Sequence, residues 1–196
     1  VSNALIALDE TRQDAPLFAV GDGNHSLASA RAAWLALKAT LSPAQAAVHP
    51  ARWALCEVVN LYDDALSFAP IHRVLRGADV PALVRALEAG RTGAQAPVTL
   101  VTPQGDKQLT GLPIDVLQPI LDAYLQEHPS ASIDYVHGDE AARQLGRQED
   151  GCALLLTVLS KYDLFPSIAR GPLPRKSFSM GEAQEKRCYF ECRRIR

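Results

Sequence analysis

The sequence predicts an α/β (α+β) protein in which helices flank a mixed sheet. Short apolar runs rich in β-branched residues alternate with segments whose apolar residues recur at helical spacing. Turn-forming residues separate these segments, and one pair of runs has the composition of a hairpin. With 196 residues the chain is long enough for a substantial core. We expect one α/β unit over residues 1–196.

Strands are expected where apolar or β-branched runs are bounded by turn-forming residues. These runs are 17–20, 53–61, 67–75, 98–102, 107–110, 132–137 and 152–159. The pair 98–102 and 107–110 is joined by Pro103-Gln104-Gly105-Asp106, which favours a hairpin. The runs 53–61 and 67–75 are expected to lie side by side.

Helices are expected where start signals precede helical periodicity. The helices predicted in this way are 27–37 after a glycine loop, 42–48 with a Ser42–Gln45 capping box, 79–90 from Asp79 and Pro81, 139–145 from Asp139, and 180–194 after a Ser179–Glu182 capping box. A further helix is expected to end before Pro129 with Pro119 in its first turn, and its upstream boundary is left open.

Composition narrows the classes of function. The net charge of −2 provides no strong positive field, so nucleic-acid binding is disfavoured. No apolar run approaches the roughly 20 residues of a membrane span, and residues 1–10 lack a leader pattern, so we expect a cytoplasmic protein with no membrane partner. Cys188 and Cys192 are spaced to share a metal, but no second pair completes a zinc site. Buried thiols are the favoured interpretation.

The loop Gly21-Asp22-Gly23-Asn24-His25-Ser26 is the strongest candidate site. A loop between a strand end and a helix start directs backbone N–H groups and the helix dipole at one point, where anions bind. Two glycines permit a sharp turn, and the other residues add a carboxylate, an amide, an imidazole and a hydroxyl. The alternative is structural: Asn24 or Ser26 caps the helix, Asp22 bonds turn amides, and His25 is a surface residue.

Two further segments carry functional groups. Arg175 and Lys176, followed by Ser177, precede the last predicted helix and could meet an anion there, although a solvated charge run explains them equally well. His72 and Arg73 are consecutive in a predicted strand, which places an imidazole and a guanidinium on opposite faces. At most one of these two side chains can face a given cleft.

Several strings together resemble the domain-of-unknown-function 1015 family of bacteria and archaea. They are 18–28, 49–60, Pro70-Ile71-His72-Arg73, 134–139 and Pro174-Arg175-Lys176-Ser177-Phe178-Ser179-Met180-Gly181-Glu182-Ala183. The resemblance extends over nearly the whole chain. Members are normally longer at the amino end, so the chain resembles the carboxyl-terminal half of one.

The Asp-Gly-x-His pattern of Asp22, Gly23 and His25 is similar to a loop of the ParB, sulfiredoxin and free serine kinase superfamily. That similarity implies a partly ParB-like fold and a loop that holds nucleotide phosphates. In the hypothesis built on this similarity, His25 contacts the phosphates and Asp22 holds Mg²⁺ or acts as a base, while His72 lines the cleft and Lys176 neutralises developing charge. Asn24 and Ser26 replace the common His and Arg, which removes a bidentate phosphate contact.

Three hypotheses follow. The first is a nucleotide-dependent phosphotransferase or nucleotidase that acts on a small molecule, with Asp22 and His25 catalytic, Mg²⁺ at Asp22, and ATP, ADP or CTP as the nucleotide. The second is a non-catalytic module that binds an anionic metabolite or nucleotide through Gly21–Ser26. The third is a scaffold without chemistry. Neither the substrate nor the oligomeric state follows from the sequence.

Overall fold

The computed structural model describes residues 2–11, 16–21 and 23–180. The described residues group into two compact units, one of residues 2–63 and one of residues 64–180. The sheet lies in the second unit, and each unit is described by itself. The single unit expected over residues 1–196 stays a prediction.

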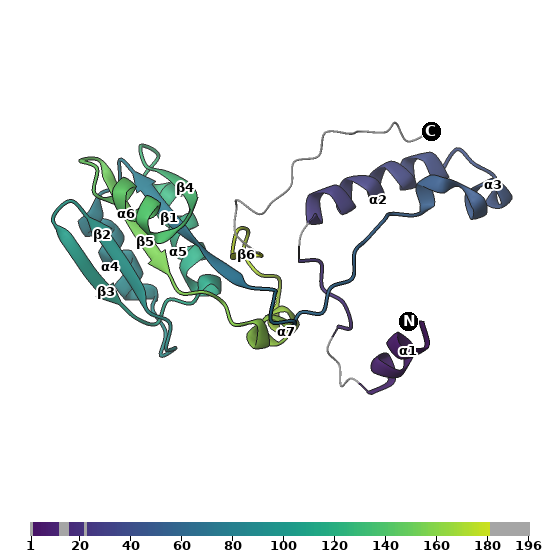
Figure 1. Ribbon diagram of the computed structural model, residues 1–196. Coiled ribbons are helices and arrows are strands. Elements are labelled where there is room, and N and C mark those ends of the chain that lie inside the picture. Colours follow the sequence, from purple (N-terminus) through teal and green to yellow (C-terminus); the bar gives the residue numbers. More distant parts are fainter. Residues whose placement is uncertain (1, 12–15, 22, 181–196) are drawn as a thin grey trace. The chain divides into compact units, whose positions relative to one another are not determined.

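The second unit is built on an antiparallel sheet (Figure 1). Its strands are β1 (Phe68–Arg76), β2 (Val98–Thr102), β3 (Gly105–Leu109), β4 (Ser132–His137), β5 (Gly151–Leu156) and β6 (Phe178–Met180). The order is β3-β2-β5-β1-β4, and β6 pairs with the amino-terminal end of β1. Every strand pair in the described residues is antiparallel. The predicted α+β class and the β2–β3 hairpin are confirmed.

Helices cover both faces of this sheet. The helices of the second unit are α4 (Val80–Gly90), α5 (Ile114–Glu127), α6 (Asp139–Gly146) and α7 (Lys161–Arg170). Helices α4 and α5 supply Leu83, Leu87 and Leu121 to a core on one face, while α6 supplies Ala142 to a smaller cluster on the other. The sheet is therefore the middle layer of three.

Neighbouring residues of the central strands belong to different cores. Leu75 and Leu154 pack with α4 and α5, whereas Val74 and Ala153 pack with α6. Successive side chains of a strand point to opposite faces, so a strand covered on both sides has a continuous apolar run. This two-sided burial explains the uninterrupted apolar sequence of β5.

The first unit is helical and sparsely packed. It contains α1 (Ser2–Thr11), α2 (Asn24–Lys38), α3 (Pro43–Val48) and the 3-10 turn η1 (Pro50–Arg52). The predicted capping box is present, because the Ser42 hydroxyl accepts from the Gln45 amide and the Gln45 side chain accepts from the Ser42 amide. Among the described residues of this unit only the Ala46 side chain is buried. Its apolar residues are largely exposed.

Two predicted strands are absent from the first unit. Residues 17–20 and 53–61 form neither strand nor helix, and Leu55 is fully exposed at 103%. A strand exists only when a neighbouring strand accepts its backbone hydrogen bonds. The neighbours of β1 are β4, β5 and β6, so the expected pairing of 53–61 with 67–75 is wrong.

Near the carboxyl end, the structure corrects helix boundaries. Helix α5 begins at Ile114, so Pro119, which was expected in the first turn, lies further inside the helix. Helix α7 was not predicted, because Pro166 interrupts its pattern. Met180, the expected start of the last helix, pairs with Phe68 as part of β6. The rest of that predicted helix lies outside the described residues.

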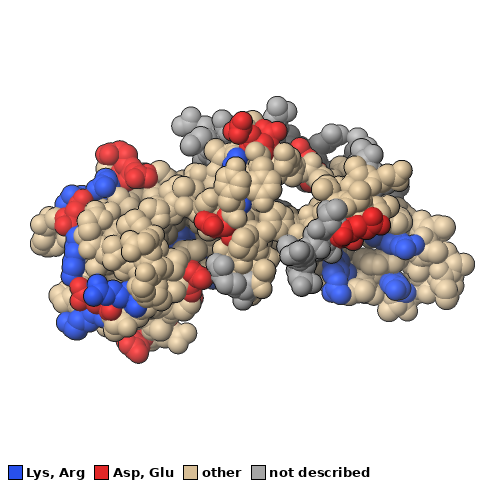
Figure 2. Space-filling view, turned by 90° about the horizontal axis from the view of Figure 1, so that it is seen from below, with Lys and Arg blue, Asp and Glu red and all other residues tan. Residues whose placement is uncertain are grey.

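No helix in the described part of the chain has the length and apolar character needed to cross a lipid bilayer. On the face drawn in Figure 2, basic side chains are interspersed with acidic ones, as expected for near-neutral charge.

The core on the α4–α5 face can be tested with one truncation. Leu121→Ala removes a completely buried side chain, and we expect a loss of about 2–5 kcal/mol in the free energy of unfolding. The same truncation at exposed Leu55 should cost less than about 0.5 kcal/mol. Urea unfolding followed by circular dichroism measures both; equal losses would contradict the described burial.

Candidate functional site

The predicted loop forms the start of α2. Gly23 is the residue before the helix and has a left-handed backbone, with φ +78°, which glycine adopts without strain. The Asn24 side chain donates to the Val20 carbonyl at 3.2 Å, which closes the turn. Asp22 lies outside the described residues, so its expected roles in catalysis and Mg²⁺ binding stay predictions.

The residues at the start of α2 are exposed to solvent. The first helical hydrogen bond joins the Leu27 amide to the Gly23 carbonyl at 2.9 Å, and among the described residues no side chain caps the helix. Within the described residues, the amides of Asn24, His25 and Ser26 have no acceptor. Gly21, Gly23, Asn24, His25 and Ser26 are all exposed. The loop therefore presents three amides together with an imidazole and a hydroxyl.

His72 is buried on the face of β1 that packs against α6. Its Nδ1 accepts from the Leu156 amide at 3.1 Å, so the proton of the neutral ring is on Nε2. Nε2 donates to the Asp139 carboxylate at 3.0 Å. Burial lowers the pKa of His72 below 6.5, while the hydrogen bond and charge of Asp139 oppose that shift. Both ring nitrogens thus have protein partners.

Arg73 faces the opposite core, as the strand alternation predicted. Its Nε donates to the Gln118 side chain on α5 at 2.9 Å, and its guanidinium lies 4.7 Å from the centre of the Tyr135 ring. Its other donors bond backbone carbonyls, including those of Arg175 and Lys176. The structure therefore brings Arg73 to the predicted segment 175–177.

The segment 175–177 is a turn and not the start of a helix. The Ser177 hydroxyl donates to the Pro174 carbonyl at 2.6 Å, and β6 follows directly. The side chains of Arg175 and Lys176 are exposed. These residues belong to the second unit, whereas Gly21–Ser26 belongs to the first.

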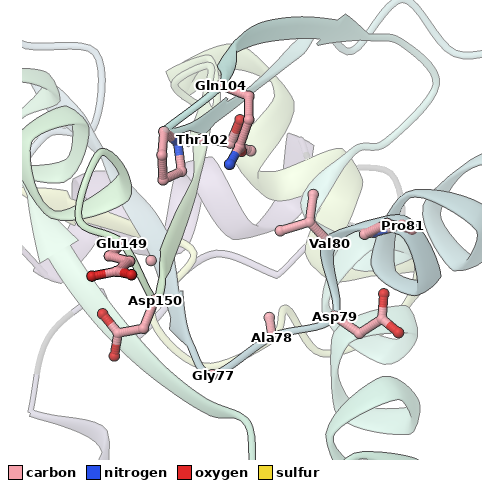
Figure 3. A pocket seen from close by; sticks show the side chains of 11 residues that line it. Gly77, Ala78, Asp79, Val80, Pro81, Thr102, Gln104, Glu149 and Asp150 are labelled. Atoms are coloured by element: carbon pink, nitrogen blue, oxygen red, sulfur yellow. The ribbon is translucent and has the colours of Figure 1, made fainter.

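Pockets also lie on the second unit. One, of about 620 Å³, lies where β1 and β2 end and β5 begins, with Glu149 and Asp150 on one side and Asp79 on the other (Figure 3). None of the predicted site residues lines it. Another, of about 350 Å³, is lined by apolar residues and by polar ones that include Asp115, Asp163 and Ser177. No group of three His, Cys, Asp or Glu side chains suited to a metal occurs in the described ranges.

Sequence reasoning missed the partners of the two β1 side chains. Asp139 was expected to cap a helix, yet it is the first residue of α6 and bonds His72. Gln118 was assigned no role, although its side chain connects Arg73 to Asp122. The available signal was a charged residue inside an apolar strand, since a buried charge requires partners.

The buried imidazole predicts a pH dependence of stability. Because the pKa of His72 is lower in the folded state, the unfolded chain binds more protons at this histidine as the pH falls. The contribution of His72 to stability is therefore complete above the pKa of the same histidine in the unfolded chain and is lost as the pH falls below 6.5. His72→Gln should therefore flatten the decline in unfolding free energy between pH 7 and pH 5. His25→Gln, at an exposed position, should leave the profile unchanged. Identical profiles for wild type and His72→Gln would refute this role.

Comparisons with known proteins place the chain in a family. A model described as a protein of unknown function, DUF1015, matches residues 2–145, well over half of the chain. No curated protein matches the sequence. A conserved hypothetical protein from Pyrococcus furiosus is similar in structure, with a TM-score of 0.51 and 12% identity over 64% of this chain and 60% of that protein. At that identity the likeness shows the fold alone, and the chain spans 60% of the length of that protein. By the family match, the chain belongs to the DUF1015 family, whose function is unknown.

Proposed function

We propose that the Gly21–Ser26 loop binds the phosphate group of a small anionic ligand, and that this ligand is a nucleotide. The observation that carries the proposal is the start of α2, where Asn24, His25 and Ser26 are exposed residues whose amides have no acceptor among the described residues. Such amides bind oxyanions, because each donates a hydrogen bond and the helix dipole adds positive potential.

The local geometry suits an oxyanion for a second reason. The left-handed Gly23 has open space where a side chain would begin, since no atom lies within 4 Å of a Cβ built there. A ligand can therefore approach the backbone closely. The exposed His25 imidazole and Ser26 hydroxyl provide two further donors.

A phosphotransferase or nucleotidase reaction is the catalytic form of this proposal. Phosphoryl transfer mainly requires positioning and charge stabilisation, which amides at a helix start contribute. In this form His25 contacts the transferred phosphate, and Asp22 holds Mg²⁺ or acts as the base. The bond between the transferred phosphoryl group and the rest of the nucleotide breaks, the remainder of the nucleotide leaves, and the phosphoryl group passes to a hydroxyl of a small molecule in the phosphotransferase or to water in the nucleotidase.

The second candidate is a non-catalytic module that binds an anionic metabolite or nucleotide. Asn24 and Ser26 favour it, because neither supplies the positive charge that an arginine would contribute to a transferring phosphoryl group. Binding is common to both candidates, and turnover separates them.

Nucleotide binding should be measured on the whole chain. We expect calorimetry with ATP, ADP or CTP, with and without Mg²⁺, to show binding that falls at least tenfold, equivalent to about 1.4 kcal/mol, in His25→Ala and Asp22→Ala. Ser26→Ala removes a hydroxyl beside the open amides and should weaken binding, whereas Ser29→Ala, one turn along the exposed side of α2, should not.

Nuclear magnetic resonance identifies the amides involved. Added nucleotide should shift the amide resonances of Asn24, His25 and Ser26 more than those of the following turns of α2. Release or transfer of phosphate would then select the enzyme over the binding module. If no nucleotide binds and these three resonances do not move, the proposal is wrong.

A further inference from the structure

The guanidinium of Arg73 is fully buried, and backbone carbonyls supply most of its acceptors. It donates to the Gln118 side chain at 2.9 Å, to the Ile71 carbonyl at 2.6 Å, to the Lys176 carbonyl at 2.9 Å and to the Arg175 carbonyl at 3.3 Å. No ion pair between Arg73 and a carboxylate is found in the described part of the chain. A buried cation is tolerated only when its donors are satisfied.

Two of these acceptors come from a turn about a hundred residues away in sequence. Burial lowers the pKa of Arg73 to about 10, and the charges of Tyr135 and Asp122 oppose that shift, so the guanidinium is charged at neutral pH. Loss of the two turn carbonyls would leave donors of this charge unsatisfied. Arg73 therefore holds the backbone of the turn in one conformation, with the carbonyls of residues 175 and 176 directed inward.

That conformation is unfavourable for a lysine. Lys176 has φ +58°, and it is the one residue other than glycine with positive φ among those described. Left-handed backbone costs a residue with a Cβ about 1–2 kcal/mol, whereas glycine adopts it freely. The side chain is exposed and makes no hydrogen bond or ion pair with the described residues. Stability would favour glycine here, so the lysine requires another explanation.

The adjacent residues supply further groups suited to an anion. The Arg175 side chain is also exposed, and the described residues give it no ion-pair partner. Ser177 lines the pocket of about 350 Å³. That pocket is also lined by Asp115 and Asp163, which would repel an anion. The outer side of the turn, at Arg175 and Lys176, is the favourable position for negative charge.

We infer that the turn Pro174–Ser177 binds one phosphate group between the Arg175 and Lys176 side chains, with Arg73 as a positioning residue that contacts the turn and not the ligand. Two adjacent cations on a rigid turn lose less conformational freedom on binding than the same side chains on a flexible segment. The phosphate class of ligand rests on the proposed function, but the site is a separate one on the second unit.

The substitution Lys176→Gly separates binding from stability. We expect the midpoint of thermal unfolding to stay the same or rise, since glycine relieves the strained backbone. The affinity for inorganic phosphate at the turn, followed by the amide resonances of residues 175–177, should fall at least fivefold. Lys176→Arg should retain most of the affinity, and Lys38→Gln, which removes an exposed positive charge elsewhere, should change nothing.

Arg73→Lys tests the positioning role. Lysine keeps the charge but cannot reproduce the four hydrogen bonds, so phosphate affinity at the turn should fall while the response of residues 24–26 is retained. Arg76→Lys, on the same strand but pointing to partly exposed partners, is the matched control. A loss of the same size at both groups of amides would indicate general destabilisation and refute the role.

The two proposals fail separately. If phosphate or sulfate moves the resonances of residues 24–26 but not those of 175–177, this inference is wrong and the proposed function stands. If only residues 175–177 respond, the proposed function is wrong for the loop and the turn is the phosphate site. Equal phosphate affinity in wild type and in both Lys176→Gly and Arg175→Ala would overturn the inference.

Discussion

A buried positive charge in the middle of an antiparallel sheet constrains how the second unit is arranged. Arg73 lies on β1, the strand that pairs with β4, β5 and β6, and its guanidinium joins that strand to α5 and to the turn before β6. Hydrophobic packing alone would accept many arrangements of the turn. Four directional hydrogen bonds from a desolvated cation are compatible with very few arrangements of the turn. The backbone of the exposed residues Arg175 and Lys176 is therefore held in one conformation.

Local sequence signals predicted much of this fold. The capping box at Ser42, the Asp79 cap and the hairpin turn at 103–106 are determined by near neighbours in sequence, and the structure has all three. The runs 17–20 and 53–61 have strand composition but no strand partner among the described residues. Periodicity reports which side chains prefer burial and does not supply the neighbouring strand.

The candidate site was predictable to a different degree in each unit. The opposite orientations of His72 and Arg73 followed from strand geometry, and the open helix start followed from the glycines of the loop. The partners Gln118 and Asp139 did not, because they are 45 and 67 residues distant from Arg73 and His72 in sequence. Contacts at that separation depend on strand order and register, which local patterns do not encode.

Consecutive residues of β1 need hydrogen-bond partners on opposite faces of the sheet. His72 requires the carboxylate and amide on the α6 side, whereas Arg73 requires the amide and carbonyls on the α5 side. Insertion or deletion of one residue between Phe68 and Ile71 would shift the pairing of β6 with the start of β1 by one residue. If that pairing were kept instead, the side chains of His72 and Arg73 would point to the opposite faces of the sheet. We therefore expect related sequences to keep the length of this stretch, while the residue types at its partly exposed amino-terminal end can vary.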